Sequence, residues 1–192
     1  MIAGVILAAG EGSRFGKGPK QLAELDGRLL LQHAVDAQLG VPALERIVVV
    51  LGARADEIEP RIQFGDAEPV RCDGWEEGIG ASLRCGLEAL GDDLDAVLIT
   101  LGDQPRITSQ VIAMVLDYGL DTREPAARAT YDGRPGHPVL LRAPLLPAAR
   151  QLQGDHGARE LLSAVKVRLV EASRLCSDAD VDTPEQLSAL RT

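Results

Sequence analysis

The stretch Val5-Ile6-Leu7-Ala8-Ala9-Gly10-Glu11-Gly12-Ser13-Arg14-Phe15-Gly16-Lys17-Gly18-Pro19-Lys20 decides the fold. Its first five residues are apolar without interruption, which is typical of a strand that is buried on both faces of a parallel sheet. The loop that follows carries three cations and is rich in glycine, which lets backbone N–H groups turn toward an anion. The stretch therefore predicts a strand that ends in a phosphate-binding loop. The alternative is a solvated turn rich in glycine and lysine.

Two familiar nucleotide motifs are excluded by the spacing of this loop. A Walker A loop needs four residues between its first glycine and Gly-Lys-Ser/Thr, whereas five residues separate Gly10 from Gly16-Lys17. Gly18 also stands where that motif has its hydroxyl. A dinucleotide fingerprint needs glycine where Phe15 stands. The loop is therefore a phosphate cradle of another kind.

The strand–helix pattern repeats along the chain. Further apolar strands are predicted at Ile47–Leu51, Ala96–Leu101 and Val165–Val170. Helical spacing is found at 29–39, 55–62 and 81–90, after the N-cap candidate Thr108, and from Pro184 onward. We therefore predict one domain over residues 1–192, with a three-layer α/β/α fold around a mostly parallel central sheet. Ligands in such sheets collect where strands end and helices begin.

The overall composition excludes several classes of protein. The chain of 192 residues has 20 Lys/Arg against 29 Asp/Glu and a net charge of −9, which argues against a nucleic-acid partner. Ile2–Ala9 is too short for a signal peptide, and no run reaches the roughly 18 apolar residues of a membrane span. We expect a soluble cytoplasmic protein without a membrane partner. Three cysteines without CxxC spacing are expected to be reduced core thiols rather than a disulfide or zinc set.

Carboxylates suited to a metal occur in two segments. Asp103 follows the predicted strand Ala96–Leu101, at the sheet edge where a metal ligand would face a nucleotide. It could equally be a turn former or a helix cap before Pro105. Asp178, Asp180 and Asp182 alternate along Ser177–Glu185, and extended backbone points alternate residues the same way. Asp182 or Thr183 could instead cap the helix that Pro184 begins.

Two further segments are candidates for ligand contacts. Trp75–Arg84 runs into a predicted helix, whose first N–H groups and Ser82 hydroxyl can meet a base or a phosphate. Ser82 could also be an ordinary residue of the first turn. Gly133–Leu140 contains His137 between two prolines. A single histidine is more often packed or at the surface than catalytic, and the prolines could mean only a rigid turn before a strand.

Taken in order, these motifs resemble the MobA-like nucleotidyltransferases, which include the bacterial molybdenum cofactor guanylyl- and cytidylyltransferases. Leu7 to Gly16 together with Lys20 match the signature L-A-A-G-x-x-x-R-x-G…K of that family. The chain departs from the common form at Phe15, where Met is frequent, and at Gly18-Pro19. The resemblance implies the Rossmann-like fold of the nucleotide-diphospho-sugar transferases. It covers nearly the whole chain.

The resemblance also implies roles for individual residues. Arg14 would bind the leaving pyrophosphate, Lys20 would bind the α-phosphate, and Asp103 would be the principal ligand of Mg²⁺. The run Asp180-Val181-Asp182-Thr183-Pro184-Glu185 resembles the family's D-x-D-T-P-E motif, in which Asp180 is our first choice to complete the metal site and Asp182 the second. Gly78, Gly80 and Ser82 match a segment beside the base. The implied nucleotide-binding residues are Leu7, Ala8, Ala9, Gly10, Gly12, Ser13, Arg14, Lys20, Gly78, Gly80, Ser82 and Asp103.

Two segments look like the cytidylyltransferase branch in particular. These are Gly133-Arg134-Pro135-Gly136-His137-Pro138 and Gly154-Asp155-His156-Gly157-Ala158-Arg159-Glu160-Leu161-Leu162. By resemblance both face the acceptor, and His137 and Arg159 would contact its pterin or its phosphate. His137 is not expected to act as a general base, because the nucleophile is already a phosphate oxygen. His33 and His156 are expected to be structural.

The implied function is Mg²⁺-dependent transfer of CMP, or GMP, from a nucleoside triphosphate to the phosphate of a molybdopterin-type cofactor, with release of pyrophosphate. CTP is favoured over GTP because Ala8-Ala9-Gly10 and the Gly-His-Pro run look like the cytidylyl branch. The implied protein partner is a molybdenum enzyme or its chaperone, in a transient contact. The alternatives are the same chemistry on a sugar or alcohol phosphate, or a non-catalytic carrier for a molybdenum hydroxylase. An oxidoreductase has no support from a dinucleotide fingerprint or a cysteine cluster.

Overall fold

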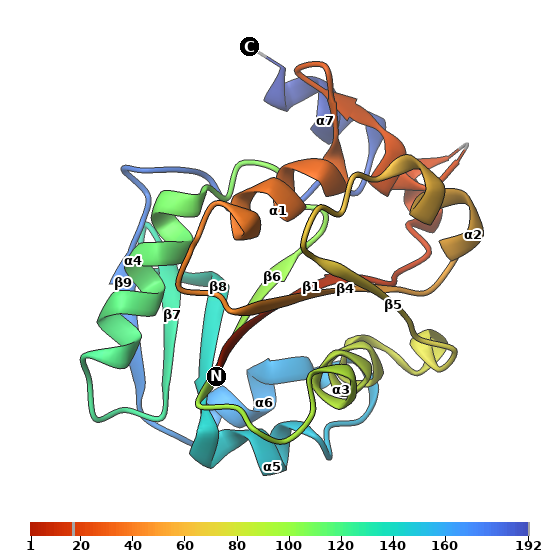
Figure 1. Ribbon diagram of the computed structural model, residues 1–192. Helices are drawn as coiled ribbons and strands as arrows, with labels where there is room; N and C mark the ends of the chain where they lie inside the picture. The colour runs from red at the N-terminus through yellow and green to blue at the C-terminus, as the bar shows by residue number, and fades with distance from the viewer. Residues whose placement is uncertain (17, 192) are drawn as a thin grey trace.

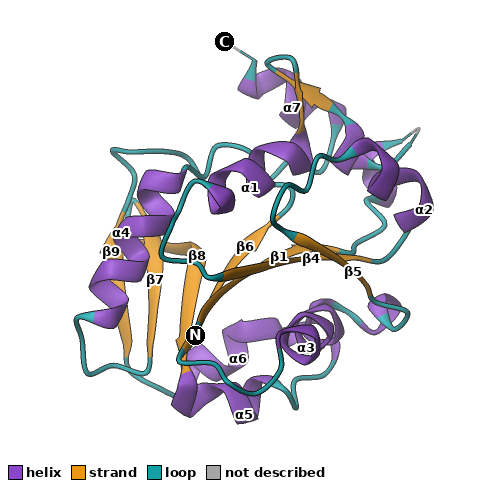
Figure 2. Ribbon diagram, viewed as in Figure 1, coloured by secondary structure: helices purple, strands orange, loops and turns teal. Residues whose placement is uncertain are grey.

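The computed structural model describes residues 1–16 and 18–191, so that Lys17 of the phosphate loop lies outside the described residues. A seven-stranded sheet in the order β5-β4-β1-β6-β8-β7-β9 forms the centre of the molecule (Figures 1 and 2). Its strands are β1 Ile2–Ala8, β4 Arg46–Leu51, β5 Glu68–Arg71, β6 Ala96–Leu101, β7 Ala126–Tyr131, β8 Arg134–Arg142 and β9 Val167–Glu171. Six of them run parallel and β8 runs against them, which confirms the predicted mostly parallel sheet.

Helices cover both faces of this sheet (Figure 1). On one face lie α1 Leu30–Leu39, α2 Ala55–Ile58, α4 Ser109–Leu120 and α7 Pro184–Leu190, and on the other α3 Ile79–Leu90, α5 Leu146–Ala149 and α6 Gly157–Ser163. A small hairpin of β2 Glu24–Leu25 and β3 Arg28–Leu29 lies outside the main sheet. Side chains alternate along a strand, so that Ile6 packs into the core between the sheet and α1 and α4. Val5 and Leu7 pack into the core between the sheet and α3. The three-layer α/β/α architecture is therefore confirmed.

Element boundaries follow local chemistry. Thr108 caps α4 by accepting a hydrogen bond from Val111 N, as predicted. Thr183 caps α7 in a capping box with Gln186, so that the hypothesis of Asp182 as the cap is wrong. The helix predicted at 55–62 ends early, at Ile58, and continues as the 3₁₀ turn Glu59–Arg61 around Pro60. No helix in the described ranges is both long and apolar enough to cross a membrane.

The expectation of three reduced thiols is wrong for two of the cysteines. Cys72 and Cys85, whose Cα atoms are 5.8 Å apart, form a disulfide, whereas Cys176 is free. Cys72 lies just beyond β5 and Cys85 lies on α3, which packs across β4 and β5. The pairing depends on this packing of a helix against the sheet, and the spacing of cysteines along the chain does not reveal it.

Candidate functional site

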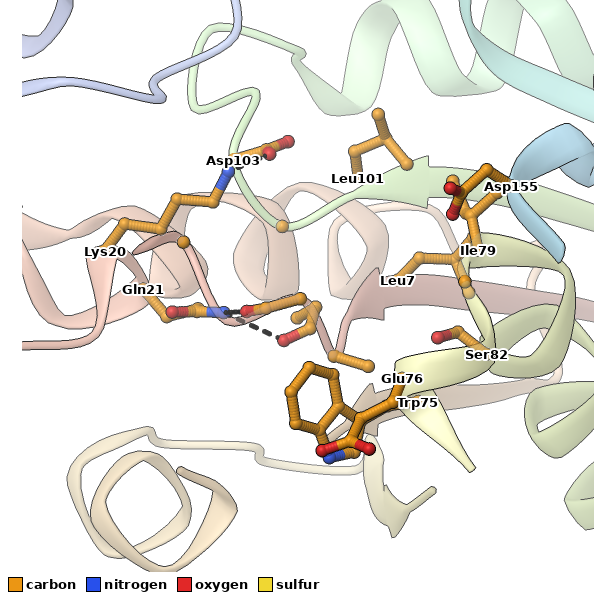
Figure 3. A pocket seen from close by; sticks show the side chains of 16 residues that line it. Leu7, Lys20, Gln21, Trp75, Glu76, Ile79, Ser82, Leu101, Asp103 and Asp155 are labelled. Atoms are coloured by element: carbon orange, nitrogen blue, oxygen red, sulfur yellow. Dashed lines mark hydrogen bonds and ion pairs between the residues drawn. The ribbon is translucent and has the colours of Figure 1, made fainter. Parts of the chain in front are cut away.

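A cavity of about 340 Å³ opens at the carboxyl ends of β1 and β6 (Figure 3). Most of the predicted nucleotide-binding residues line it, namely Leu7, Ala8, Ala9, Gly10, Gly12, Lys20, Gly78, Ser82 and Asp103. Ser13, Arg14 and Gly80 lie outside this lining. The remaining wall consists of residues that were not predicted individually, namely Gln21, Trp75, Glu76, Ile79, Leu101, Gly102 and Asp155, although Trp75, Glu76, Ile79 and Asp155 lie in predicted ligand-contact segments. We call this cavity the first cavity.

Lys20 lies at one end of the first cavity, between two carboxylates. Its Nζ donates to Asp103 Oδ2 at 2.6 Å and to Asp182 Oδ1 at 2.8 Å, and the residue is only 8% exposed. Burial lowers the pKa of Lys20, but the two carboxylates outweigh burial and hold the pKa above its ordinary value. Gly12 makes room for this side chain, because a Cβ at Gly12 would come within 3.0 Å of Lys20 Cγ.

Asp182 joins Lys20 to Arg14. Arg14 Nη2 donates to Asp182 Oδ2 at 2.8 Å, while the Arg14 side chain remains 74% exposed. The hydrogen bond from Lys20 holds the pKa of Asp182 below its ordinary value. The structure thus brings the side-chain carboxylate of Asp182 together with Arg14 and Lys20 of the N-terminal loop, and 168 residues of sequence separate Arg14 from Asp182. Arg14 keeps most of its surface free to meet a ligand.

Gln21 shapes the loop after β1, although sequence reasoning missed it. Its Nε2 donates to the carbonyl oxygens of Ala8 and Gly10, both at 3.0 Å (Figure 3). These two bonds fix the backbone where the strand turns into the glycine loop. The only sequence signal was its place directly after Lys20, in the 3₁₀ turn Lys20–Leu22.

Asp103 and Asp180 offer carboxylate oxygens for a divalent cation. Asp103 Oδ1 is buried and has no hydrogen-bond partner among the described residues. Burial raises the pKa of Asp180, and the charge of Asp103 raises it further. Asp180 accepts a hydrogen bond from Gln104 Nε2 at 2.8 Å. Within residues 1–16 and 18–191 there is no group of three or more His, Cys, Asp or Glu side chains arranged for a metal, so these two carboxylates form an incomplete oxygen set.

The segment around α3 forms another part of the wall of the first cavity. A Cβ at Gly78 or Gly80 would come within 2.7 or 2.9 Å of the Gly154 backbone, so that both glycines let the loop at 153–155 pack closely. Trp75 lies against Gly52, where a Cβ would come within 2.6 Å of it. Ser82 is buried and lines the cavity, whereas Gly80 contributes only this close packing.

The two predicted acceptor residues line a second cavity, of about 400 Å³. Its wall contains Pro135, His137, Val139, Ala158, Arg159, Leu162 and Arg128, and it shares Ile79 and Asp155 with the first cavity. Burial lowers the pKa of His137 to about 4, and the charge of Arg128 contributes. The ring is therefore neutral near pH 7. His33 is elsewhere, with Nε2 3.0 Å from Leu25 O, and the side chain of His156 lies outside the described residues.

The amino-acid sequence is similar to a known family and to a known protein. Residues 4–171 match the family described as the MobA-like NTP transferase domain. The chain is also similar to the protein named nicotine blue oxidoreductase of Paenarthrobacter nicotinovorans, with 34% identity over 197 residues that cover 98% of this chain and 96% of that protein.

Solved structures show the same fold. The chain is similar to Rv0371c of Mycobacterium tuberculosis H37Rv, with a TM-score of 0.86, 26% identity, and coverage of 98% of this chain and 96% of that one. A manganese complex of Rv0371c superimposes with a TM-score of 0.83 at 24% identity, over 98% and 97% of the two chains. A nucleotidyl transferase from Methanothermobacter thermautotroptrophicus has a TM-score of 0.83 at 27% identity, over 100% and 96% of the two chains.

Proposed function

The chain belongs to the MobA-like NTP transferase family, and from that premise we propose that it transfers CMP from CTP to the phosphate of a molybdopterin-type acceptor and releases pyrophosphate. The observation that carries the proposal is the position of Lys20. Its buried ammonium group lies beside the glycine loop and between Asp103 and Asp182, at the edge of the sheet where such folds bind nucleotides.

The chemistry asks the protein mainly for positioning and charge. An oxygen of the acceptor phosphate attacks the α-phosphorus in line, a new P–O bond forms, and the bond to the β-phosphate breaks. Lys20 donates hydrogen bonds to the α-phosphate, and Arg14 turns from Asp182 toward the leaving pyrophosphate. No side chain has to remove a proton, because the attacking oxygen is already ionised near neutral pH. The neutral ring of His137 therefore has no role as a base.

Asp103 and Asp180 are proposed to hold the divalent cation, which we take to be Mg²⁺. The cation supplies neutralisation of the charge on the phosphates. The Asp103 Oδ1 atom supports this choice because it is buried without a hydrogen-bond partner among the described residues. The raised pKa of Asp180 supports it because burial and the charge of Asp103 disfavour the ionised carboxylate, which a cation would stabilise. Asp182 is the second choice, since Lys20 and Arg14 already engage both of its oxygens. Rv0371c has been solved with manganese, which adds support for a divalent cation.

The nucleotide and the acceptor are the finer parts of the proposal. CTP is preferred to GTP because Ala8-Ala9-Gly10 and Gly136-His137-Pro138 look like the cytidylyl branch. The second cavity shares Ile79 and Asp155 with the first, and this proximity supports His137 and Arg159 as contacts of the acceptor. A molybdenum enzyme or its chaperone would then receive the product.

A second candidate function comes from one similar protein. The name of the Paenarthrobacter relative describes an oxidoreductase that acts on nicotine blue, and its similarity covers 98% of this chain. An oxidoreductase would need an electron donor. The loop at 10–16 lacks the glycine pattern of a dinucleotide fingerprint, and the cysteines in the described chain form no cluster of metal ligands. We therefore rank this function below nucleotidyl transfer.

Pyrophosphate release tests the proposal directly. The protein is incubated with molybdenum cofactor, Mg²⁺ and each of the four nucleoside triphosphates, and CTP is expected to give the fastest release. Asp103→Asn should lower the rate by about 100-fold or more. Asp178→Asn is the matched control. Asp178 lies in the same segment as Asp180, but its ion-pair partner is Arg134, at 3.9 Å, and not Lys20.

Other outcomes identify the alternatives. Release with a sugar or alcohol phosphate, and none with molybdenum cofactor, would replace the acceptor. Tight cofactor binding that Asp103→Asn leaves intact, without turnover of any triphosphate, would indicate a carrier. Oxidation of NADH or NADPH in the presence of nicotine blue, without pyrophosphate release, would establish the oxidoreductase instead.

A further inference from the structure

Arg128 is a cation without a carboxylate within salt-bridge distance among the residues that the structure describes. It lies in the middle of β7, and its Nε and Nη2 both donate to a single acceptor, the carbonyl oxygen of Gly136, at 3.3 and 3.1 Å. In the described part of the chain nine arginines lie within 4.0 Å of a carboxylate, and neither Arg128 nor Arg159 is among them. Several guanidinium N–H groups of Arg128 are therefore available to a ligand.

The surroundings of Arg128 make its charged state unfavourable. Ala126 and Arg128 face the layer that contains α6, because Ala126 belongs to the core on that side of the sheet. Burial lowers the pKa of Arg128, and the positive charge of Arg159 lowers it further. Two guanidinium groups that line one cavity without a salt-bridge partner among the described residues repel, and one of them has also lost solvation. A bound anion removes both costs at once.

The space between these groups is large enough for such an anion. Arg128, His137 and Arg159 line the second cavity, of about 400 Å³, and the rest of its wall is largely apolar. Asp155 is the one acid in its lining, and it lies toward Gly78, at the wall shared with the first cavity. The lining of the second cavity therefore holds two guanidinium groups against one carboxylate.

We propose that Arg128 and Arg159, together with the ring of His137, form a phosphate-binding site, and that Arg128 is the residue that requires the second substrate to be a phosphomonoester. Arg159 and His137 were expected to contact the acceptor by resemblance, whereas Arg128 had no predicted role. Naming the anion as the second substrate rests on the proposed nucleotidyl transfer. The site itself rests on the unpaired guanidinium groups and the cavity.

Histidine NMR tests the site without any turnover. The chain has three histidines, so that the ring signals of His137 can be assigned with a His137→Gln variant. The first cavity is first filled with a non-hydrolysable CTP analogue and Mg²⁺. Inorganic phosphate is then titrated in, with chloride as the control for ionic strength. The His137 signals should move saturably, whereas the His33 signals should not.

Variants make the result specific. Arg128→Gln should weaken phosphate binding by about 10-fold to 100-fold, which corresponds to one or two charge-assisted hydrogen bonds. Arg128→Lys should retain part of the affinity. Arg168→Gln is the matched control, since Arg168 lies on the neighbouring strand β9, where it stacks 5.7 Å from the centre of the Tyr118 ring. Arg159→Gln, at an exposed position on α6, gives an independent test should Arg128→Gln fail to fold.

The outcomes separate this inference from the proposed function. A flat His137 titration, or an identical titration in Arg128→Gln, overturns the phosphate site even if CTP is turned over. Phosphate binding that depends on Arg128, in a protein that turns over no triphosphate, leaves the site standing and removes nucleotidyl transfer. If both stand, Arg128→Gln should raise the KM for the acceptor and leave the KM for CTP unchanged.

Discussion

Each of the two cavities has a pair of cations in its wall or beside it, and the pairs differ in their partners. Lys20 in the wall of the first cavity and Arg14 beside it bind Asp103 and Asp182 at 2.6 to 2.8 Å. In the second, Arg128 and Arg159 have no carboxylate within salt-bridge distance among the described residues. The first pair is held in place by the protein's own acids before a ligand arrives, and a phosphate has to compete with them. The second pair depends on a ligand to supply the negative charge.

The largest expected effect is that of removing the paired cation. Lys20→Ala leaves Asp103 and Asp182 without their shared buried partner, and so the free energy of unfolding should fall by about 3 kcal/mol. Pyrophosphate release should fall by about 1,000-fold, because a donor to the α-phosphate is lost. Denaturant titration and a steady-state assay measure the two effects. Lys20→Arg is the charge-preserving control, and a wild-type rate in Lys20→Ala would remove Lys20 from the reaction.

A smaller effect is expected at the exposed member of the same pair. Arg14→Ala should raise the KM for the triphosphate and lower kcat, by about 10-fold in kcat/KM, since one charge-assisted contact to the leaving group is lost. Its effect on unfolding should be slight, because the side chain is 74% exposed. Arg28→Ala, at another exposed arginine paired with one carboxylate, is the control. Unchanged kinetics in Arg14→Ala would contradict the role of Arg14.

The lack of a salt-bridge partner for Arg128 among the described residues should affect the pH dependence of stability, through His137. The pKa of His137 is about 4 in the fold and 6.5 ordinarily, because of burial and then Arg128. Below pH 6.5 the unfolded chain takes up this proton and the folded chain does not, so stability should fall as the pH drops from about 6.5 to about 4. Urea titrations across this range should show a shallower loss in His137→Gln.

The charges that face the His137 ring define a second arm of this test. They are Arg128 from β7, Arg159 from α6 and Asp155 from the turn Gly154–His156, while the hydroxyl of Tyr131 donates to the His137 carbonyl. Arg128→Gln should therefore move the pKa of His137 upward, as measured by NMR. If that pKa does not change, Arg128 and His137 do not share one cavity in solution.

The smallest effect on stability is expected at Arg128 when Arg128 and Lys20 are each replaced by methionine and the two variants are compared. Arg128→Met should change the free energy of unfolding by less than about 1 kcal/mol, because the lost hydrogen bonds to Gly136 are offset by relief of the repulsion from Arg159. Lys20→Met should instead destabilise the protein much as Lys20→Ala does. A large loss of stability in Arg128→Met would show that Arg128 is structural, and the contrast between the two cavities would disappear.

Local sequence patterns predicted the parts of this protein that depend on local physics. The continuous apolar runs gave the strands, and Asp103 could be placed near the glycine loop because the carboxyl ends of parallel strands meet at one edge. Thr108 was found as a cap because its hydroxyl bonds within the same turn. The catalytic and binding roles of the site residues stay predictions until the experiments above are done.

The rest depends on contacts between distant segments. Asp182 was expected to be a helix cap or the second choice, after Asp180, to complete the metal site, yet it binds two cations that lie more than 160 residues away. Arg128 is the single charged residue of a short strand, and only the antiparallel β8 and the helix α6 around it make its charge significant. Gln21 was missed because its partners are backbone carbonyl groups, which no sequence pattern displays.

The disulfide between Cys72 and Cys85 has a practical consequence for every one of these measurements. It closes a loop that carries Trp75, Gly78 and Ser82, all of which line the first cavity. A thiol reductant added to keep Cys176 from oxidising would also break this link, and the triphosphate would then meet a wall in which α3 is no longer tethered to the chain after β5. Buffers with and without reductant therefore contain two different proteins, and kinetic constants from one should not be compared with constants from the other.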